Sequence, residues 1–348
     1  MDKPSAQPTP KHVLPFLLPL SAAGSADGAY LMAGSPKQIM IWETENYTAK
    51  DTIEYEFGAV KMAANPTQAD QFAVVSSPGN PVSLWSIKGA NRTAELGQKD
   101  KNNKINSVAI NAAGTRLLAG NNEICENWDI ETQKKLQAVP RAGTVVDAQW
   151  DPSMPDRLAT CSVREGAQPL SMVFLWDQRN GPDPIGECTL PMGMGVNAIR
   201  FNNQGQLICS SPGQYTIIDV KKMALLEYLS IDGKQKSKSP LHPAPGKTHN
   251  ANSMLVPTGT SDMFLAGIDD GNVITADLAN PSQSQHLQVN GMPDAIYGLV
   301  LNSQKQTLAT TLMGAGFVKI WDASELQSHL EKRTKELADK RNRKCDLV

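Results

Sequence analysis

A short apolar phrase ending in Trp recurs along this chain of 348 residues at nearly constant intervals. Two degenerate copies, residues 216–219 and 273–277, lack the Trp, and the other copies centre on Trp42, Trp85, Trp128, Trp176 and Trp321. Counting positions 218 and 276 as equivalents, successive copies lie 43, 43, 48, 42, 58 and 45 residues apart. A repeat of roughly 40–45 residues of this kind is typical of four-stranded propeller blades. Seven copies therefore predict an all-β chain folded as a seven-bladed β-propeller.

Each repeat reads as an inner strand, a polar turn, a second strand and a third strand that carries the Trp. The third repeat shows this order most plainly, with alternating apolar residues over 105–110, a turn over 111–114, and strands over 116–119 and 124–130. The expected propeller covers residues 17–323.

The same residues resemble the WD-repeat family. Ser25-Ala26-Asp27-Gly28 is similar to that family's turn between the first two strands, and Trp is followed by Asp in three repeats. The family usually joins a Gly-His dipeptide, a turn Asp and the Trp in one hydrogen-bond network. This chain has no Gly-His dipeptide, and the turn Asp is clear only at Asp269-Asp270. The resemblance therefore implies a divergent member.

The two ends fall outside the repeats. Residues 1–16 form an N-terminal extension, and in the WD-repeat family such a segment supplies the outer strand of the last blade. Pro4, Pro8 and Pro10 disfavour a long strand, so we expect a short ring-closing strand around residues 12–14.

Residues 324–348 are expected to form a short C-terminal α-helix followed by a basic tail. Ser324-Glu325-Leu326-Gln327 has the form of a capping box, and an apolar stripe follows at Leu326, Leu330 and Leu337. Two alternatives stay open: the helix packs on the propeller's own side, or it docks another chain.

Composition narrows the class of partner. The net charge is −2, with residues 331–348 at +3 and the remainder at −5, which disfavours bulk nucleic-acid binding. The five cysteines contain no CxxC and favour a reducing compartment, the cytoplasm or the nucleus. No apolar run reaches the length of a membrane span.

Motifs of catalysis are missing from the sequence. It contains no GxSxG, P-loop or GxGxxG, and its five histidines have no metal-ligand spacing. The inner strands read as apolar and small. We therefore expect no enzyme activity, no cofactor and no metal. The alternative is a lactonase-type propeller enzyme, which would need a carboxylate or His facing the central channel.

Two long loops supply candidate partner-binding residues. Residues 163–171 and 232–252 exceed the minimal repeat, and the WD-repeat architecture would place both on one face over blades 4 to 6. The alternative is ordinary variation in loop length. The exposed candidates on this rim are Arg164, Glu165, Lys234, Lys236, Lys238 and His242.

Two short motifs add alternatives. Trp176-Asp177-Gln178-Arg179 matches a Trp-Asp-x-Arg ending that, in some WD-repeat proteins, accompanies docking onto a cullin-4 ubiquitin ligase adaptor. The other explanation of Arg179 is an ion pair within its own blade. Cys345 is followed by three residues and preceded by a basic run, which is similar to a lipidation site; the alternative is a solvated tail.

The sequence as a whole predicts a non-catalytic scaffold that binds other proteins in a complex. A substrate receptor of a cullin-4 ligase is the first alternative function.

Overall fold

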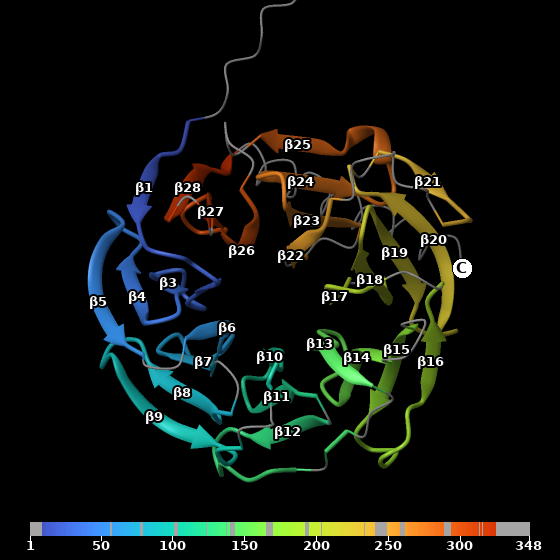
Figure 1. Cartoon of the computed structure of the whole chain (residues 1–348), viewed down its shortest axis with the longest axis horizontal. Coiled ribbons are helices and arrows are strands. Elements are labelled where there is room, and N and C mark those ends of the chain that lie inside the picture. The colour runs from blue at the N-terminus through green and yellow to red at the C-terminus, as the bar shows by residue number, and fades with distance from the viewer. Residues whose placement is uncertain are drawn as a thin grey trace, which may run out of the picture.

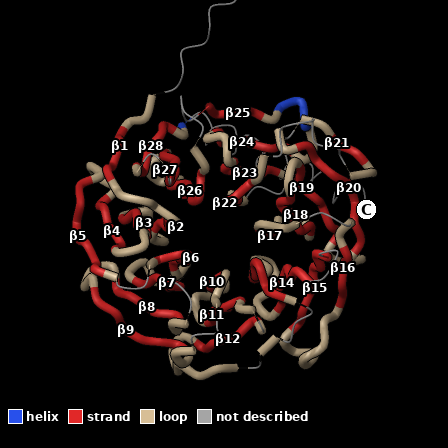
Figure 2. Tube along the Cα trace, viewed as in Figure 1, coloured by secondary structure: helices blue, strands red, loops and turns tan. Residues whose placement is uncertain are grey.

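The computed structural model describes residues 9–324, except 56–57, 77–78, 101–103, 123, 137, 140–142, 165–169, 192–194, 203, 233, 241–248, 258–261, 289–293, 313 and 315. Its strands form seven antiparallel sheets arranged around a common centre (Figure 1). The prediction of an all-β, seven-bladed propeller is confirmed. Strands dominate the described trace, and a short 3-10 helix, η1 (Pro281–Gln283), lies in blade 6 (Figure 2). The predicted C-terminal helix lies outside the described residues.

Successive sheets follow one another along the chain, and the last is completed by the first strand. Blade 1 consists of β2 (Ser21–Gly24), β3 (Tyr30–Gly34), β4 (Gln38–Glu43) and β5 (Thr48–Glu54). Blade 2 consists of β6 (Ala59–Ala64), β7 (Gln71–Ser76), β8 (Val82–Ser86) and β9 (Asn91–Leu96). In blade 3 the described residues form three strands, β10 (Ser107–Ile110), β11 (Arg116–Gly120) and β12 (Cys125–Asp129). Blade 4 consists of β13 (Thr144–Trp150), β14 (Arg157–Arg164), β15 (Leu170–Asp177) and β16 (Gly186–Thr189).

The remaining blades contain the two degenerate repeats and the closure. Blade 5 has five strands, β17 (Ala198–Phe201), β18 (Gln206–Ser211), β19 (Gln214–Asp219), β20 (Ala224–Ser230) and β21 (Lys236–Ser237). Blade 6 consists of β22 (Ala251–Leu255), β23 (Met263–Ile268), β24 (Asn272–Asp277) and β25 (Gln285–Gln288). Blade 7 consists of β26 (Ile296–Asn302), β27 (Thr307–Leu312), β28 (Phe317–Asp322) and β1 (His12–Pro15).

All seven repeat positions occupy the same place in their blades. Each lies in the third strand and pairs with an apolar residue of the second strand. The pairs are Leu31 with Trp42, Phe72 with Trp85, Leu117 with Trp128, Leu158 with Trp176, Leu207 with Ile218, Phe264 with Ala276, and Leu308 with Trp321. The periodicity in the sequence therefore reports the register of the sheets, including the two copies without Trp.

Strand β1 closes the ring. It runs antiparallel to β28, with His12 opposite Ile320 and Pro15 opposite Phe317, and it lies where the sequence predicted a short closing strand. An ion pair of 2.8 Å joins Lys11 Nζ to Asp322 beside this pairing. The hydrogen bond from Lys11 holds the pKa of the Asp322 carboxyl well below its usual range.

The turns between first and second strands also join neighbouring blades. Asn65 Nδ2 donates 2.9 Å to the carbonyl of Gly114, and Asn302 Nδ2 donates 2.7 Å to the carbonyl of Gly28. The first bond joins blades 2 and 3, and the second joins blade 7 to blade 1. Gly114 has φ +70°, and a Cβ there would lie 2.3 Å from Asn65 Oδ1. Only glycine suits both the backbone conformation and the close approach.

The core lies between blades rather than in one central mass. Tyr215 and Ile217 of blade 5 pack in one cluster with Phe264 and Ile274 of blade 6. The rings of Tyr215 and Phe264 meet edge to face with centroids 4.7 Å apart. Each sheet therefore buries its apolar faces against the next sheet, which makes the ring continuous.

Parts of the WD-repeat hydrogen-bond network survive in separate blades. In blade 4 Trp176 Nε1 donates 3.0 Å to Thr160 Oγ1, and in blade 7 Trp321 Nε1 donates 3.0 Å to Thr310 Oγ1. Each threonine lies in the second strand of the same blade. These bonds satisfy a buried indole N–H that would otherwise be left without a partner.

Blade 6 contains the contact between a His before the inner strand and an Asp in the turn before the third strand. His249 Nδ1 and Asp269 Oδ1 lie 2.8 Å apart, and the His249 carbonyl accepts a 2.8 Å bond from the Gly213 amide of blade 5. His249 precedes the inner strand β22, and Asp269 occupies the turn after β23. This pair has no Gly-His signature in the sequence because Thr248, and not Gly, precedes His249.

Candidate functional site: the central channel and the ring-closing patch

A cavity of about 200 Å³ occupies the centre of the ring. All seven inner strands contribute to its lining: β2, β6, β10, β13, β17, β22 and β26. Figure 1 shows most of these strands grouped around the open centre, and Figure 2 also labels β2 there. The cavity is therefore a product of the whole ring and not of any one blade.

One equivalent position in each blade forms a layer around this cavity. In blade 1, for example, Trp42 pairs with Leu31 of the second strand, and Gly34, three residues after Leu31, pairs with Ser21 of the inner strand. The same offset identifies one inner-strand residue in every blade. These inner-strand residues, which we call the channel layer, are Ser21, Lys61, Ser107, Asp147, Ala198, Ser253 and Gly298. Every member lines the cavity.

Four inner strands are irregular at the channel layer. The register shifts by one residue immediately before Lys61, Asp147, Ser253 and Gly298, in blades 2, 4, 6 and 7. A bulge of this kind bends the strand and re-aims the side chains beside it. Lys61 and Asp147 both come directly after such a bulge, in strands that are otherwise mostly apolar in sequence.

Asp147 links blades 4 and 5. Its Oδ2 accepts bonds of 3.0 Å from the Ile199 amide and 2.8 Å from Arg200 Nη1. Its Oδ1 accepts 3.0 Å from the Ala148 amide and 3.3 Å from Gln149 Nε2. The residue is only 8% exposed, so these donors replace the water that a carboxylate normally requires.

Lys61 is the third charged group of the channel. Its side chain is exposed to the channel, but the surrounding inner strands enclose it. This enclosure lowers the pKa of its ammonium, and the carboxylate of Asp147 opposes the shift. Within the described part of the chain no hydrogen bond or ion pair engages the ammonium.

These charged groups correct the expectation that the inner strands are apolar and small. Lys61, Asp147 and Arg200 were missed because each stands alone in an apolar strand. An isolated charge inside a strand such as Ala59–Ala64 is the signal that could have found them, since such a charge is rarely buried without a purpose or a partner.

The described residues contain no candidate metal cluster. No group of three or more His, Cys, Asp or Glu side chains among them could hold a metal ion. The channel lining contains one carboxylate, Asp147, which already accepts four hydrogen bonds, and no histidine of the described chain lines it. No helix in this part of the chain is long and apolar enough to cross a membrane.

The described cysteines should be unreactive in the native protein. Cys125, Cys161, Cys188 and Cys209 are buried free thiols, and burial raises the pKa of each. They stay neutral at pH 7 to 8, and a thiol is nucleophilic only as a thiolate. In a Cys345→Ser variant, a thiol-specific chromogenic reagent should therefore label no cysteine until denaturant is added. Labelling of a stoichiometric thiol in the folded variant would contradict this expectation.

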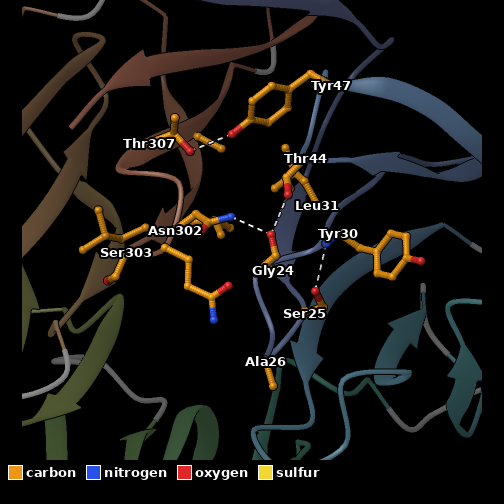
Figure 3. A pocket seen from close by; sticks show the side chains of 15 residues that line it. Gly24, Ser25, Ala26, Tyr30, Leu31, Thr44, Tyr47, Asn302, Ser303 and Thr307 are labelled. Carbon is orange, nitrogen blue, oxygen red and sulfur yellow. Dashed lines mark hydrogen bonds between the residues drawn. The ribbon is translucent and has the colours of Figure 1, made fainter. Parts of the chain in front are cut away.

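A polar groove of about 450 Å³ lies between blades 7 and 1 (Figure 3). Tyr47 Oη and Thr307 Oγ1 share a 2.6 Å hydrogen bond across it. The Gly28 carbonyl accepts bonds from both Asn302 and Thr44, at 2.7 and 2.6 Å. The hydrogen bond between Tyr47 and Thr307 and the one from Asn302 to Gly28 join blades 1 and 7, so they stabilise the closed ring.

Exposed apolar side chains gather beside the closing strand. Six large apolar side chains of the described chain are exposed, and four of them are Val13, Leu17, Leu18 and Phe317, which are 46%, 76%, 47% and 36% exposed. Pro15 pairs directly with Phe317, which places β1 and the segment after it beside the start of β28. We call these four residues the ring-closing patch. Figure 1 shows β1 at the periphery of the ring.

Arg179 lies just after the third strand of blade 4 and is 63% exposed. Its Nε and Nη2 donate 2.9 and 2.6 Å to the two carboxylate oxygens of Asp177. This hydrogen bonding lowers the pKa of the Asp177 carboxyl to about 2. The ion pair within the blade is therefore present, and the remaining guanidinium surface faces solvent.

The predicted rim residues have different environments. Lys236 lies in β21 and pairs with Glu227 at 2.9 Å, and Lys238 Nζ donates 3.0 Å to the Leu226 carbonyl. The exposed Arg164 and Lys234 side chains make no ion pair within the described chain. Six candidates lie outside the described residues: Glu165, His242, Leu326, Leu330, Leu337 and Cys345.

Comparison with known proteins gives two partial matches. No family model matches the sequence. Protein transport protein SEC31 of Yarrowia lipolytica is 27% identical over 161 residues, which cover 42% of this chain and 13% of that protein. Periodic tryptophan protein 1 homolog of Drosophila melanogaster is 24% identical over 214 residues, which cover 56% of this chain and 42% of that protein. The chain thus spans less than half the length of either relative.

Proposed function

We propose that this chain, a divergent WD-repeat β-propeller, is a non-catalytic interaction platform that holds other proteins in a multi-protein assembly. The ring provides a rigid frame because its closing strand, its inter-blade cores and its turns are all bonded to neighbours. One relative is named for protein transport and the other for its periodic tryptophans, and both are longer than this chain. Their likeness supports a binding role without indicating a particular assembly.

The ring-closing patch carries this proposal. Isolated apolar side chains are normal on a protein surface, but a larger apolar patch indicates an interaction site. The four residues come from two segments that are bonded to each other, since Pro15 pairs with Phe317 and the Phe16 amide donates to the Gly316 carbonyl. Leu17 is 76% exposed, and Phe317 lies across the strand pair from Pro15. A partner that covers these side chains would remove their apolar surface from water, at roughly 25 cal/mol per Å².

The chemistry of the described residues favours binding over catalysis. The channel carboxylate of Asp147 is engaged by four donors, and the described thiols are neutral. A lactonase-type enzyme would need an acid–base pair that these residues do not supply. The free thiols support a reducing compartment, and we therefore propose the cytoplasm or the nucleus.

A surface substitution tests the platform. In a Leu17→Ser, Phe317→Ser double variant, quantitative affinity purification should show loss of the proteins that co-purify with the wild-type chain. The reason is that serine removes the apolar area while leaving the backbone pairing of β1 and β28. Circular dichroism and the Tm of each variant check that the ring stays folded.

The chain offers a matched control. Met154 and Ile185 are 40% and 45% exposed and lie away from the ring-closing patch, in blade 4. A Met154→Ser, Ile185→Ser variant should keep the partner set. Retention of the same set by both double variants would contradict the proposed surface.

Two other surfaces remain proposals. On the predicted rim, Arg164 and Lys234 are the better candidates because Lys236 and Lys238 are already bonded to β20. The cullin-4 ligase alternative rests on Arg179, whose contact with Asp177 leaves Nη1 for a partner's carboxylate. That alternative requires co-purification of a ligase adaptor that is lost on Arg179→Ala.

A further inference from the structure

The charges that line the central cavity do not balance. The lining contains three charged side chains, Lys61, Asp147 and Arg200. Arg200 Nη1 bonds Asp147 at 2.8 Å, and Arg200 Nε donates 3.0 Å to the Met254 carbonyl. The Asp147–Arg200 pair is therefore neutral as a unit and held in place from blades 4, 5 and 6. The charge of Lys61 remains uncompensated at short range.

The enclosure of Lys61 makes this excess positive charge significant. A charge surrounded by protein interacts more strongly with a counter-ion than an exposed charge does, because less water screens it. The ammonium group offers three donors, none of which is engaged within the described chain. An anion that enters the cavity would gain both the attraction and the hydrogen bonds.

A second polar group of the channel layer is also without a partner. The Ser107 hydroxyl is buried, with the residue 2% exposed, and it has no hydrogen-bond partner in the described structure. Ser107 belongs to blade 3, between the blades that carry Lys61 and Asp147. An unsatisfied buried hydroxyl is costly, but its Oγ is shielded from solvent and lies beside Gly120 of β11. Lys61 is therefore the group that an anion in the channel would meet.

The size of the cavity limits the ligand. A volume of about 200 Å³ is below the roughly 300–1,000 Å³ of sites for drug-sized ligands. It is several times the roughly 30 Å³ that one water occupies in the liquid. A single carboxylate or phosphate group with its remaining waters fits this range.

We propose that the central channel is a binding site for one small oxyanion group, a carboxylate or a phosphate, with Lys61 as its counter-ion. The Asp147–Arg200 pair lines the same cavity from blades 4 and 5 and adds no net charge. The site is independent of the ring-closing patch, so either proposal can fail without the other.

Titration of the full-length protein with inorganic phosphate and, separately, with acetate tests this site. Isothermal titration calorimetry at constant ionic strength should show saturable binding to the wild-type chain. Lys61→Met, which keeps most of the side-chain length and removes the charge, should weaken that binding by about ten-fold or more. Lys61→Arg should restore most of the affinity, and Lys37→Met, at an exposed lysine elsewhere, should leave it unchanged.

Comparison of the two affinities shows whether the site prefers a phosphate or a carboxylate group. Tighter binding of phosphate would indicate a phosphate group, and tighter binding of acetate would indicate a carboxylate. The absence of saturable binding to the wild-type chain, or equal binding by Lys61→Met, would overturn the proposal.

A measurement on the wild-type chain covers the case in which Lys61→Met fails to fold. Acetylation of lysines by a soluble reagent, followed by peptide mass spectrometry, gives a rate for each side chain. Saturating phosphate should slow the labelling of Lys61 and leave that of Lys37 unchanged. Equal slowing or no slowing at Lys61 would also overturn the proposal.

Discussion

Replacing Phe16 with alanine should lower the free energy of unfolding by about 3–5 kcal/mol, the usual effect of emptying a buried aromatic site. Phe16 is 3% exposed and follows the closing strand β1. Its ring meets that of Trp42 edge to face with centroids 5.7 Å apart. The substitution therefore leaves a cavity at the junction of the last and first blades. Denaturant unfolding followed by tryptophan fluorescence measures the loss.

The adjacent residue provides the control for Phe16→Ala. Leu17 is 76% exposed, so Leu17→Ala should change the free energy of unfolding by less than about 0.5 kcal/mol. The two variants remove side chains of comparable size from neighbouring positions. If both changed stability equally, the closing segment would not be packed as the structure shows.

Replacing Asp147 with alanine should destabilise the protein by about 3–5 kcal/mol, since it breaks a buried ion pair and leaves its partners unsatisfied. The substitution removes the acceptor of the Ile199 amide and leaves Arg200 without its carboxylate. Both groups belong to blade 5, so the loss falls on the contact between blades 4 and 5. The same unfolding experiment measures it.

A half-buried ion pair provides the comparison for Asp147→Ala. Arg116 and Asp156 lie 2.8 Å apart in the neighbouring region of blades 3 and 4, with side chains 32% and 31% exposed. Asp156→Ala should cost no more than about 1 kcal/mol because water screens and replaces the contact. A cost for Asp147→Ala as small as that for Asp156→Ala would contradict its role as a link between blades.

The sequence predicted the architecture because each blade is specified locally. Trp42 and its equivalents mark the third strand of each repeat, and the spacing alone was enough to count seven blades. Even the degenerate copies at Ile218 and Ala276 have the same register as the others. Strand formation depends on short-range alternation and turn residues, which can be read directly from neighbouring positions.

The channel could not be predicted in the same way. Asp147 and Arg200 are 53 residues apart in sequence but 2.8 Å apart in the structure. Lys61 reaches the same layer from blade 2, after a bulge for which the sequence showed no recognisable signal. A charge in an apolar strand could be noted from sequence, but its partner could not.

His249 illustrates the same limit on a smaller scale. Its contact with Asp269 is part of the family's network, yet the dipeptide that usually identifies it is missing. Only the position of His249 before β22, opposite the turn after β23, brings the two groups together.

The sequence by itself determined the number of blades and the phase of their strands, because these depend on local periodicity. The short closing strand was expected only from the resemblance to the WD-repeat family. Tertiary structure alone decided which side chains meet in the channel and which apolar residues stay exposed beside β1. Those outcomes depend on closing the ring: closure brings seven inner strands to one axis and leaves one strand pair at the junction. Distances across that axis are set by the whole ring and by no single repeat.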